Sequence, residues 1–216
     1  MATTEIYIVR HGESIANLQH RAAGHTDTPL SELGIKQAEV TAEALADIHF
    51  DRIYSSDLSR AYDTAIPHAK KRGLTVEKRV GLREIFLGEW EYLSVDEIVE
   101  KYGEEAYYGG WRENFGTYVI PGGEGAVKCG KRIYAEIEKI CTEHEGERIL
   151  IVCHGAAIRT FCLEVMGVSP EKYAETLPYP SNASYTKVFY DGERFKILEF
   201  SVDGYLEEVG KTVVNW

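Results

Sequence analysis

Short apolar runs alternate along most of the chain with longer segments whose apolar residues recur at helical spacing. This alternation is typical of an α/β fold with a largely parallel sheet. The clearest strand is the continuous apolar run 148–153, since central parallel strands are buried on both faces. The pattern predicts strands at 4–9, 51–55, 74–77 and 148–153, helices at 30–48, 58–72, 128–144 and 156–166, and a hairpin at 185–200 that turns at Asp191-Gly192.

One stretch, residues 84–124, departs from this alternation. It holds ten acidic and two basic residues, a net charge of -8 out of -11 for the whole chain, together with nine of the aromatic residues. We call it the acidic segment and expect a loop-rich insertion that lies over the sheet as a lid. Its aromatic rings suit stacking on a substrate ring, or packing into a small core of their own.

Composition narrows the class of protein. A chain of 216 residues is long enough for one domain, 1–216. The net charge of -11 argues against nucleic acid as a partner, and no run approaches the roughly 20 apolar residues of a membrane span. The first ten residues show no secretory signal, so we expect a cytoplasmic location and reduced thiols at the four cysteines. No metal-binding motif stands out, and the oligomeric state stays open.

Two predicted strands end in histidine followed by glycine. The first continues into Arg10-His11-Gly12 and the last parallel one into His154-Gly155. Ligands of open α/β sheets bind beyond the carboxyl ends of the strands. A neutral histidine can attack phosphorus, while a second, protonated histidine and an arginine can hold the phosphoryl oxygens. The pair of junctions therefore predicts a phosphoryl-transfer pocket.

The residues around these junctions form ordered motifs. Ile8-Val9-Arg10-His11-Gly12-Glu13-Ser14 is followed by further blocks at 24–38, 54–65, 82–91, 121–124 and 153–155. Together they resemble the histidine phosphatase superfamily, which includes cofactor-dependent phosphoglycerate mutases and many small phosphatases. The resemblance implies a phosphoglycerate mutase-like three-layer α/β/α sandwich with a mostly parallel central sheet.

The resemblance also implies roles for single residues. His11 would become phosphohistidine, and Glu84 would protonate the leaving oxygen and then take a proton from water. The phosphoryl oxygens would be held by Arg10, Arg60 and His154. Substrate binding would be completed by Asn17 and the backbone amides of Gly24 and Gly155. No metal or cofactor is implied, and Asn17 has a second interpretation as a helix cap.

The reaction itself has more than one interpretation. Hydrolysis of a small phosphomonoester is favoured over mutase-type transfer. Mutases that resemble the glycolytic enzyme bind a carboxylate and a second phosphate with a lysine and a pair of adjacent arginines; here the lysine position falls at Val95 and the arginine pair becomes Arg112-Glu113. The acidic segment also disfavours a second anionic group on the substrate. Sugar phosphates, nucleotides and α-ribazole phosphate stay open as substrates. Two remote alternatives are a thiolate phosphatase, since Cys153 to Arg159 fits C-x5-R, and a binder of phosphorylated ligands without turnover.

Overall fold

The computed structural model describes residues 2–213 and contains one six-stranded sheet. The strands are β1 (Thr4–Arg10), β2 (Arg52–Ser55), β3 (Val76–Lys78), β4 (Arg148–Cys153), β5 (Tyr185–Tyr190) and β6 (Phe195–Val202). Their order across the sheet is β3-β2-β4-β1-β5-β6, in which β1 to β4 are parallel and the β5–β6 hairpin is antiparallel. The mostly parallel sheet expected from the sequence is confirmed.

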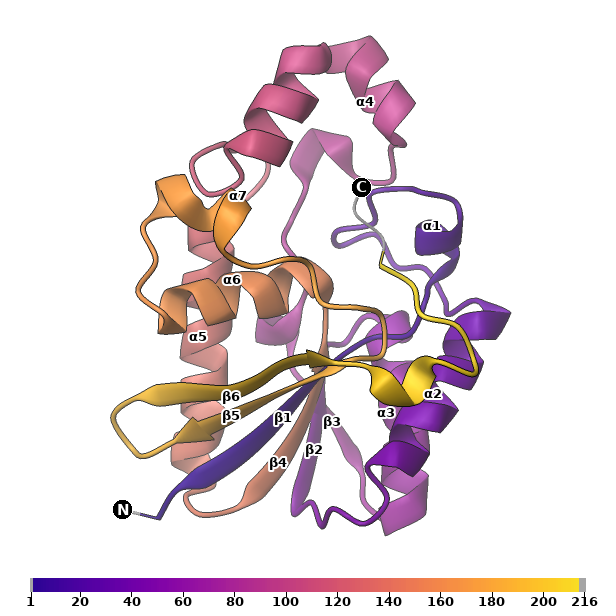
Figure 1. Cartoon of the computed structure of the whole chain (residues 1–216), viewed down its shortest axis with the longest axis vertical. Helices are drawn as coiled ribbons and strands as arrows, with labels where there is room; N and C mark the ends of the chain where they lie inside the picture. The colour runs from indigo at the N-terminus through magenta and orange to yellow at the C-terminus, as the bar shows by residue number, and fades with distance from the viewer. Residues whose placement is uncertain (1, 214–216) are drawn as a thin grey trace.

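Helices cover both faces of the sheet (Figure 1). On one face lie α2 (Glu32–Ala44) and α3 (Ser59–Arg72), and on the other α5 (Ala126–Glu143) and α6 (Gly155–Val165). Alternate residues of β1 point to opposite faces. Tyr7 and Val9 belong to the core beneath α3, whereas Ile6 and Ile8 belong to the larger core beneath α5 and α6. The chain is therefore a three-layer α/β/α sandwich.

Several helix ends differ from the sequence-based prediction. Ser31 caps α2 by accepting a 3.0 Å hydrogen bond from the backbone N–H of Gly34, and the helix ends at Ala44, four residues before the predicted limit. The third long helix, α5, begins two residues early, after Gly125 at φ 73°. Such ends depend on tertiary contacts that hydrophobic spacing does not encode.

The acidic segment is more regular than expected. It contains the 3-10 helix η2 (Gly88–Trp90), the helix α4 (Val95–Tyr102) with a reciprocal Ser94–Glu97 capping box, and a π-helix, η3 (Glu105–Glu113). These helices lie at the end of the molecule opposite the β5–β6 turn (Figure 1). Six of its nine aromatic residues belong to the large core or pack against it: Trp90, Tyr107, Trp111 and Phe115 are buried, and Tyr102 and Tyr118 are partly buried against the core.

The remaining elements are short. They are α1 (Ile15–Leu18), α7 (Tyr173–Thr176) and the 3-10 helices η1 (Val80–Leu82), η4 (Pro170–Lys172) and η5 (Gly204–Leu206). Between residues 2 and 213, no helix combines the length and the apolar character that a bilayer crossing requires.

Candidate active site

The two histidine–glycine junctions lie side by side. Strands β1 and β4 are parallel neighbours with Arg10 opposite Cys153, so His11 and His154 leave the sheet at the same edge. The backbone N–H of His11 extends the ladder by donating to the carbonyl of Cys153 at 3.0 Å. The two imidazole rings are both buried, with centroids 5.1 Å apart and planes at 62°.

His11 is held as a neutral imidazole, and one of its ring nitrogens has no hydrogen-bond partner within residues 2–213. Its Nδ1 lies 2.6 Å from the carbonyl oxygen of Gly12, and because a carbonyl only accepts, Nδ1 carries the proton. Burial, and then the positive charges of Arg60 and Arg10, lower the pKa of His11 well below its usual value. At neutral pH the lone pair on Nε2 is therefore available to attack an electrophile.

Glycine at position 12 lets the strand exit pass close to another backbone. A Cβ there would lie only 2.4 Å from the carbonyl oxygen of Gly34 in α2. The N–H of Gly12 donates to Thr64 Oγ1 at 3.0 Å, and that hydroxyl donates to the carbonyl of Arg60 at 2.7 Å. The loop that carries His11 is thus fixed against α2 and α3.

The Arg10 side chain packs directly against the backbone of Gly155. The Arg10 side chain is buried, donates from Nη1 to the carbonyl of Pro180, and has no hydrogen-bond partner at Nε among the described residues. A Cβ at position 155 would lie 3.1 Å from both Cζ and Nε of Arg10. Glycine at the start of α6 therefore leaves room for the guanidinium, a contact that the sequence-based role of Gly155 did not include.

Arg60 reaches the site from the first turn of α3. Its Nη2 donates to the carbonyl of Gly24 at 2.7 Å and its Nη1 to the carbonyl of Thr26 at 3.0 Å. Gly24 adopts φ 46°, a conformation that favours glycine. The observed contact of Gly24 is this carbonyl, which orients Arg60; binding of phosphate by its amide stays a prediction.

The two buried arginines make no direct ion pair within residues 2–213. Carboxylates, Glu84 first among them, interact electrostatically with Arg10 and Arg60 but form no salt bridge with either, and burial lowers the pKa of both, that of Arg10 to about 10. Buried charge without a directly bound partner is costly, so this edge of the sheet favours an anionic ligand. The described residues contain no group of three or more His, Cys, Asp or Glu side chains arranged to hold a metal ion.

The Glu84 carboxylate lies at the N-terminus of α6. Its oxygens accept hydrogen bonds from the backbone N–H groups of Ala156 at 3.1 Å, Ala157 at 2.8 Å and Ile85 at 2.8 Å. The positive ends of helices stabilise carboxylates at this position. Glu84 also interacts electrostatically with both Arg10 and Arg60, so the predicted proton donor is close to the predicted phosphoryl clamp.

The main chain of Glu84 is anchored by two residues that sequence reasoning missed. Its carbonyl accepts from His25 Nε2 at 2.8 Å and from Arg132 Nη2 at 3.0 Å. Arg132 stands on α5, and no local pattern marks it as part of the site. Glu91, a nearby acidic residue, instead receives N–H donors from His25, Thr26 and Leu87 and so serves the loop structure.

His154 is buried with both ring nitrogens free of partners among the described residues. Burial, and then Arg60 and His11, lower its pKa well below the usual value. The neutral ring that results carries one N–H donor, and a phosphate dianion beside it would favour the protonated form expected from the sequence. Unsatisfied buried polar atoms of this kind are uncommon and point to a ligand.

Asn17 takes part in capping helix α1 but is not its N-cap, which is Ser14. As the N3 residue, Asn17 accepts at Oδ1 from the N–H of Ser14 at 3.1 Å, completing a capping box, and from Asn182 Nδ2 at 3.2 Å. Asn182 Nδ2 also donates to the carbonyl of His11 at 3.1 Å, which ties Asn17 to the loop that carries His11. A contact between Asn17 and substrate stays a prediction.

The alternative nucleophile Cys153 is poorly placed for thiolate chemistry. It is the last residue of β4, it is fully buried, and burial raises the pKa of its thiol. Arg159, the arginine of the C-x5-R pattern, donates to the carbonyls of Tyr173, Ala174 and Leu177. The pattern thus contains no loop whose amides wrap a phosphate around the cysteine.

Comparisons with known proteins identify the family of this chain. The histidine phosphatase superfamily (branch 1) matches residues 6–203. Phosphoserine phosphatase 1 of Hydrogenobacter thermophilus is 32% identical over 94% of this chain and 95% of its own length. Phosphoglycerate mutase-like protein 4 of Arabidopsis thaliana is 34% identical, covering 95% of this chain and 88% of its own. A mycobacterial glucosyl-3-phosphoglycerate phosphatase superposes with a TM-score of 0.84 at 30% identity, covering 92% of this chain and 99% of that one. The chain belongs to the histidine phosphatase superfamily, the family that its motifs predict.

Proposed function

We propose that the protein hydrolyses small phosphomonoesters without a metal ion, through a phosphohistidine intermediate on His11. The enzyme class, a phosphoric monoester hydrolase, follows from the family and from the phosphatases among the relatives. The observation that carries the mechanism is a neutral imidazole beside two buried guanidinium groups that form no salt bridge with a carboxylate among the described residues. A phosphoryl group supplies the anion that this arrangement lacks.

In the first half of the reaction, Nε2 of His11 attacks phosphorus and the bond from phosphorus to the alcohol oxygen breaks. The hydrogen bond from Nδ1 to the carbonyl of Gly12 stabilises the positive charge that develops on the ring. Arg10, Arg60 and His154 hold the phosphoryl oxygens, where the charge of the transition state accumulates. Glu84 acts as the general acid and gives a proton to the departing oxygen, which leaves as the alcohol.

In the second half, water replaces the alcohol. The Glu84 carboxylate takes a proton from that water, the oxygen attacks phosphorus, and the bond from phosphorus to Nε2 breaks. Inorganic phosphate leaves and His11 returns to its neutral form. The Glu84 carboxylate accepts hydrogen bonds from the backbone N–H groups of Ile85, Ala156 and Ala157, which hold it in place for this step.

A phosphate-release assay separates this function from its alternatives. The protein is given para-nitrophenyl phosphate in the presence of EDTA, and separately 3-phosphoglycerate with its bisphosphate cofactor. We expect release of phosphate that EDTA does not change and that His11→Ala abolishes, whereas Cys153→Ser retains it. Fast isomerisation of phosphoglycerate with little free phosphate would favour a mutase, and a chain that binds phosphate without any turnover would be a binder.

A further inference from the structure

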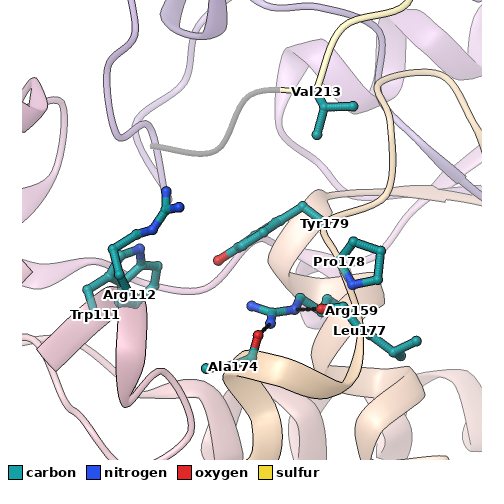
Figure 2. Close-up of a pocket in the computed structure, with 8 residues that line it drawn as sticks. All are labelled: Trp111, Arg112, Arg159, Ala174, Leu177, Pro178, Tyr179 and Val213. Atoms are coloured by element: carbon teal, nitrogen blue, oxygen red, sulfur yellow. Dashed lines mark hydrogen bonds between the residues drawn. The ribbon is translucent and has the colours of Figure 1, made fainter. Parts of the chain in front are cut away.

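A buried arginine of α6, Arg159, binds the main chain of residues 173–180, which we call the α7 loop. Its Nε donates to the carbonyl of Leu177 at 2.7 Å, and its Nη2 donates to the carbonyls of Tyr173 at 2.8 Å and Ala174 at 2.9 Å. Figure 2 shows the bonds to Ala174 and Leu177 at the wall of a cavity of about 180 Å³. In the sequence, Arg159 stands out only as the arginine of the C-x5-R pattern.

Two aromatic side chains also contact this guanidinium. Its Cζ lies 4.7 Å from the ring centres of both Phe115 and Tyr179, and a side-chain hydrogen bond joins Tyr179 to Arg159. Phe115 belongs to the acidic segment and Tyr179 to the α7 loop. Arg159 therefore connects three segments that are distant in the sequence: α6, the acidic segment and the α7 loop.

The α7 loop ends at the residue that binds Arg10. The carbonyl of Pro180 accepts from Nη1 of the buried Arg10, whose Nε has no hydrogen-bond partner within residues 2–213. Two residues later, Asn182 Nδ2 donates to the carbonyl of His11 at 3.1 Å. The place of the Arg10 guanidinium thus depends on where the α7 loop holds the carbonyl of Pro180.

The chain around Pro180 is held by side chains rather than by regular structure. Residues 177–181 form neither helix nor strand, and the prolines at 178 and 180 have no N–H to donate. Beyond Pro180, Ser181 donates from its N–H to Ser201 Oγ at 3.0 Å and from its hydroxyl to Asp203 at 2.7 Å. Before Pro180, the corresponding anchor is the set of three carbonyls that Arg159 binds.

We propose that Arg159 is a positioning residue for phosphoryl transfer, which holds the α7 loop so that the carbonyl of Pro180 fixes Arg10 beside His11. The inference rests on the proposed function, in which Arg10 holds a phosphoryl oxygen. The effect of Arg159 passes through Pro180 and Arg10 rather than through contact with the substrate. A remote change that misplaces a reacting or binding group by about 1 Å can cost about 100-fold in rate.

Replacing Arg159 with lysine tests this role. Arg159→Lys keeps the charge but loses the planar group that reaches three carbonyls at once. We expect kcat/KM for para-nitrophenyl phosphate to fall about 10- to 100-fold and the inhibition constant of inorganic phosphate to rise by about 10-fold. A second variant, Phe115→Leu, keeps an apolar side chain in the core but removes one ring from the guanidinium, and should lower kcat/KM about 3- to 10-fold. Each variant is assayed at a temperature where urea unfolding shows it to be folded.

The chain offers a matched control in Arg72, the last residue of α3, about 18 Å along that helix from Arg60. Its Cζ lies 4.8 Å from the ring centre of Phe50, and its guanidinium also donates to three carbonyls. Those carbonyls belong to Leu45, Ile48 and His68. Arg72→Lys should lower the urea midpoint but leave kcat/KM and the inhibition constant of phosphate within about twofold, because its contacts do not lead to Arg10.

Combining Arg159→Lys with Arg10→Met tests the route of the effect. If Arg159 acts through Arg10, its substitution lowers kcat/KM less than about threefold in the Arg10→Met background. The full loss in that background would overturn the route through Arg10. A folded Arg159→Lys variant with kcat/KM within twofold of the unmodified protein would overturn the positioning role, and both of these results leave the proposed function standing. No phosphate release by the unmodified protein would instead overturn the proposed function.

Discussion

Replacing Arg132 with Met tests whether the main-chain anchor of Glu84 serves catalysis. Arg132 donates to three carbonyls, those of Gly81 at 2.8 Å, Arg83 at 2.9 Å and Glu84 at 3.0 Å, and forms a two-point ion pair with Glu124. The substitution leaves the Glu124 carboxylate, only 10% exposed, without its cation. Removal of one partner of such a pair costs about 3–5 kcal/mol of folding free energy.

Arg132→Met should also lower the catalytic rate. Loss of one charge-assisted bond to the Glu84 carbonyl releases a restraint of about 1.5–3 kcal/mol, so kcat should fall about 10- to 100-fold while KM changes little. Adding Glu124→Gln removes the unpaired charge and should restore part of the stability. It should not restore kcat, because the carbonyl of Glu84 still lacks its arginine.

The assays are urea unfolding and steady-state hydrolysis of para-nitrophenyl phosphate at a temperature where each variant is folded. The control is Arg79→Met, which removes an arginine paired with Glu77 and Glu143 on the β3 side of the sheet and should lower stability without lowering kcat. If Arg132→Met is destabilised but keeps kcat within about twofold of the unmodified protein, the positioning role is refuted.

Three further predictions follow from the geometry of the site. Gly12→Ala places a methyl group 2.4 Å from the carbonyl of Gly34, so unfolding free energy should fall by at least about 2 kcal/mol, and an unchanged urea midpoint would contradict this contact. Arg60→Lys keeps the charge but not the planar fork, so kcat/KM should fall about 100-fold, whereas a loss below fivefold would show that charge alone suffices. Burial lowers the pKa of His11 and His154, so below pH 6.5 these histidines bind more protons in the unfolded chain than in the folded one. As the pH falls from 6.5 to 5.5, each histidine should therefore lower the free energy of unfolding by about 1 kcal/mol in urea titrations. A free energy of unfolding that does not change over this range would refute the prediction.

The sequence predicts those parts of the molecule whose signals are local. Strand β4 is apolar from Ile149 to Cys153 because it is covered on both faces, and its last residue fixes where His154 emerges. The junction at His11 is recognisable for the same reason. Their closeness in space follows from strand order, which places β1 next to β4.

Other parts depend on contacts between distant segments. Arg132 reaches Glu84 across 48 positions of sequence, and no spacing rule connects a helix arginine to a loop carbonyl. The π-helix η3 contains Gly109 and Gly110, which argue against a helix, yet a Cβ at position 110 would lie 2.5 Å from the Tyr118 ring. Packing therefore selects a conformation that local propensity opposes.

The net charge of the acidic segment does not predict the charge around one particular cavity. Counting residues gives -8 for positions 84–124, and that sum predicts repulsion of anions. Within the segment, Glu97 pairs with Arg21 and Glu124 pairs with Arg132, whereas Arg112 and Arg159 face a cavity of about 180 Å³ that has no carboxylate among its described lining residues. A net charge thus describes association over long distances, not the preference of one pocket.

Trapping the covalent intermediate tests the central claim most directly. The protein is mixed with a ³²P-labelled phosphomonoester, denatured in alkali within the first turnovers, digested, and the labelled peptide identified. We expect one label, stable in alkali and labile in acid, on the peptide that contains His11 and absent from His11→Ala. An acid-stable label on the peptide with Cys153, or continued turnover by His11→Ala, would contradict it.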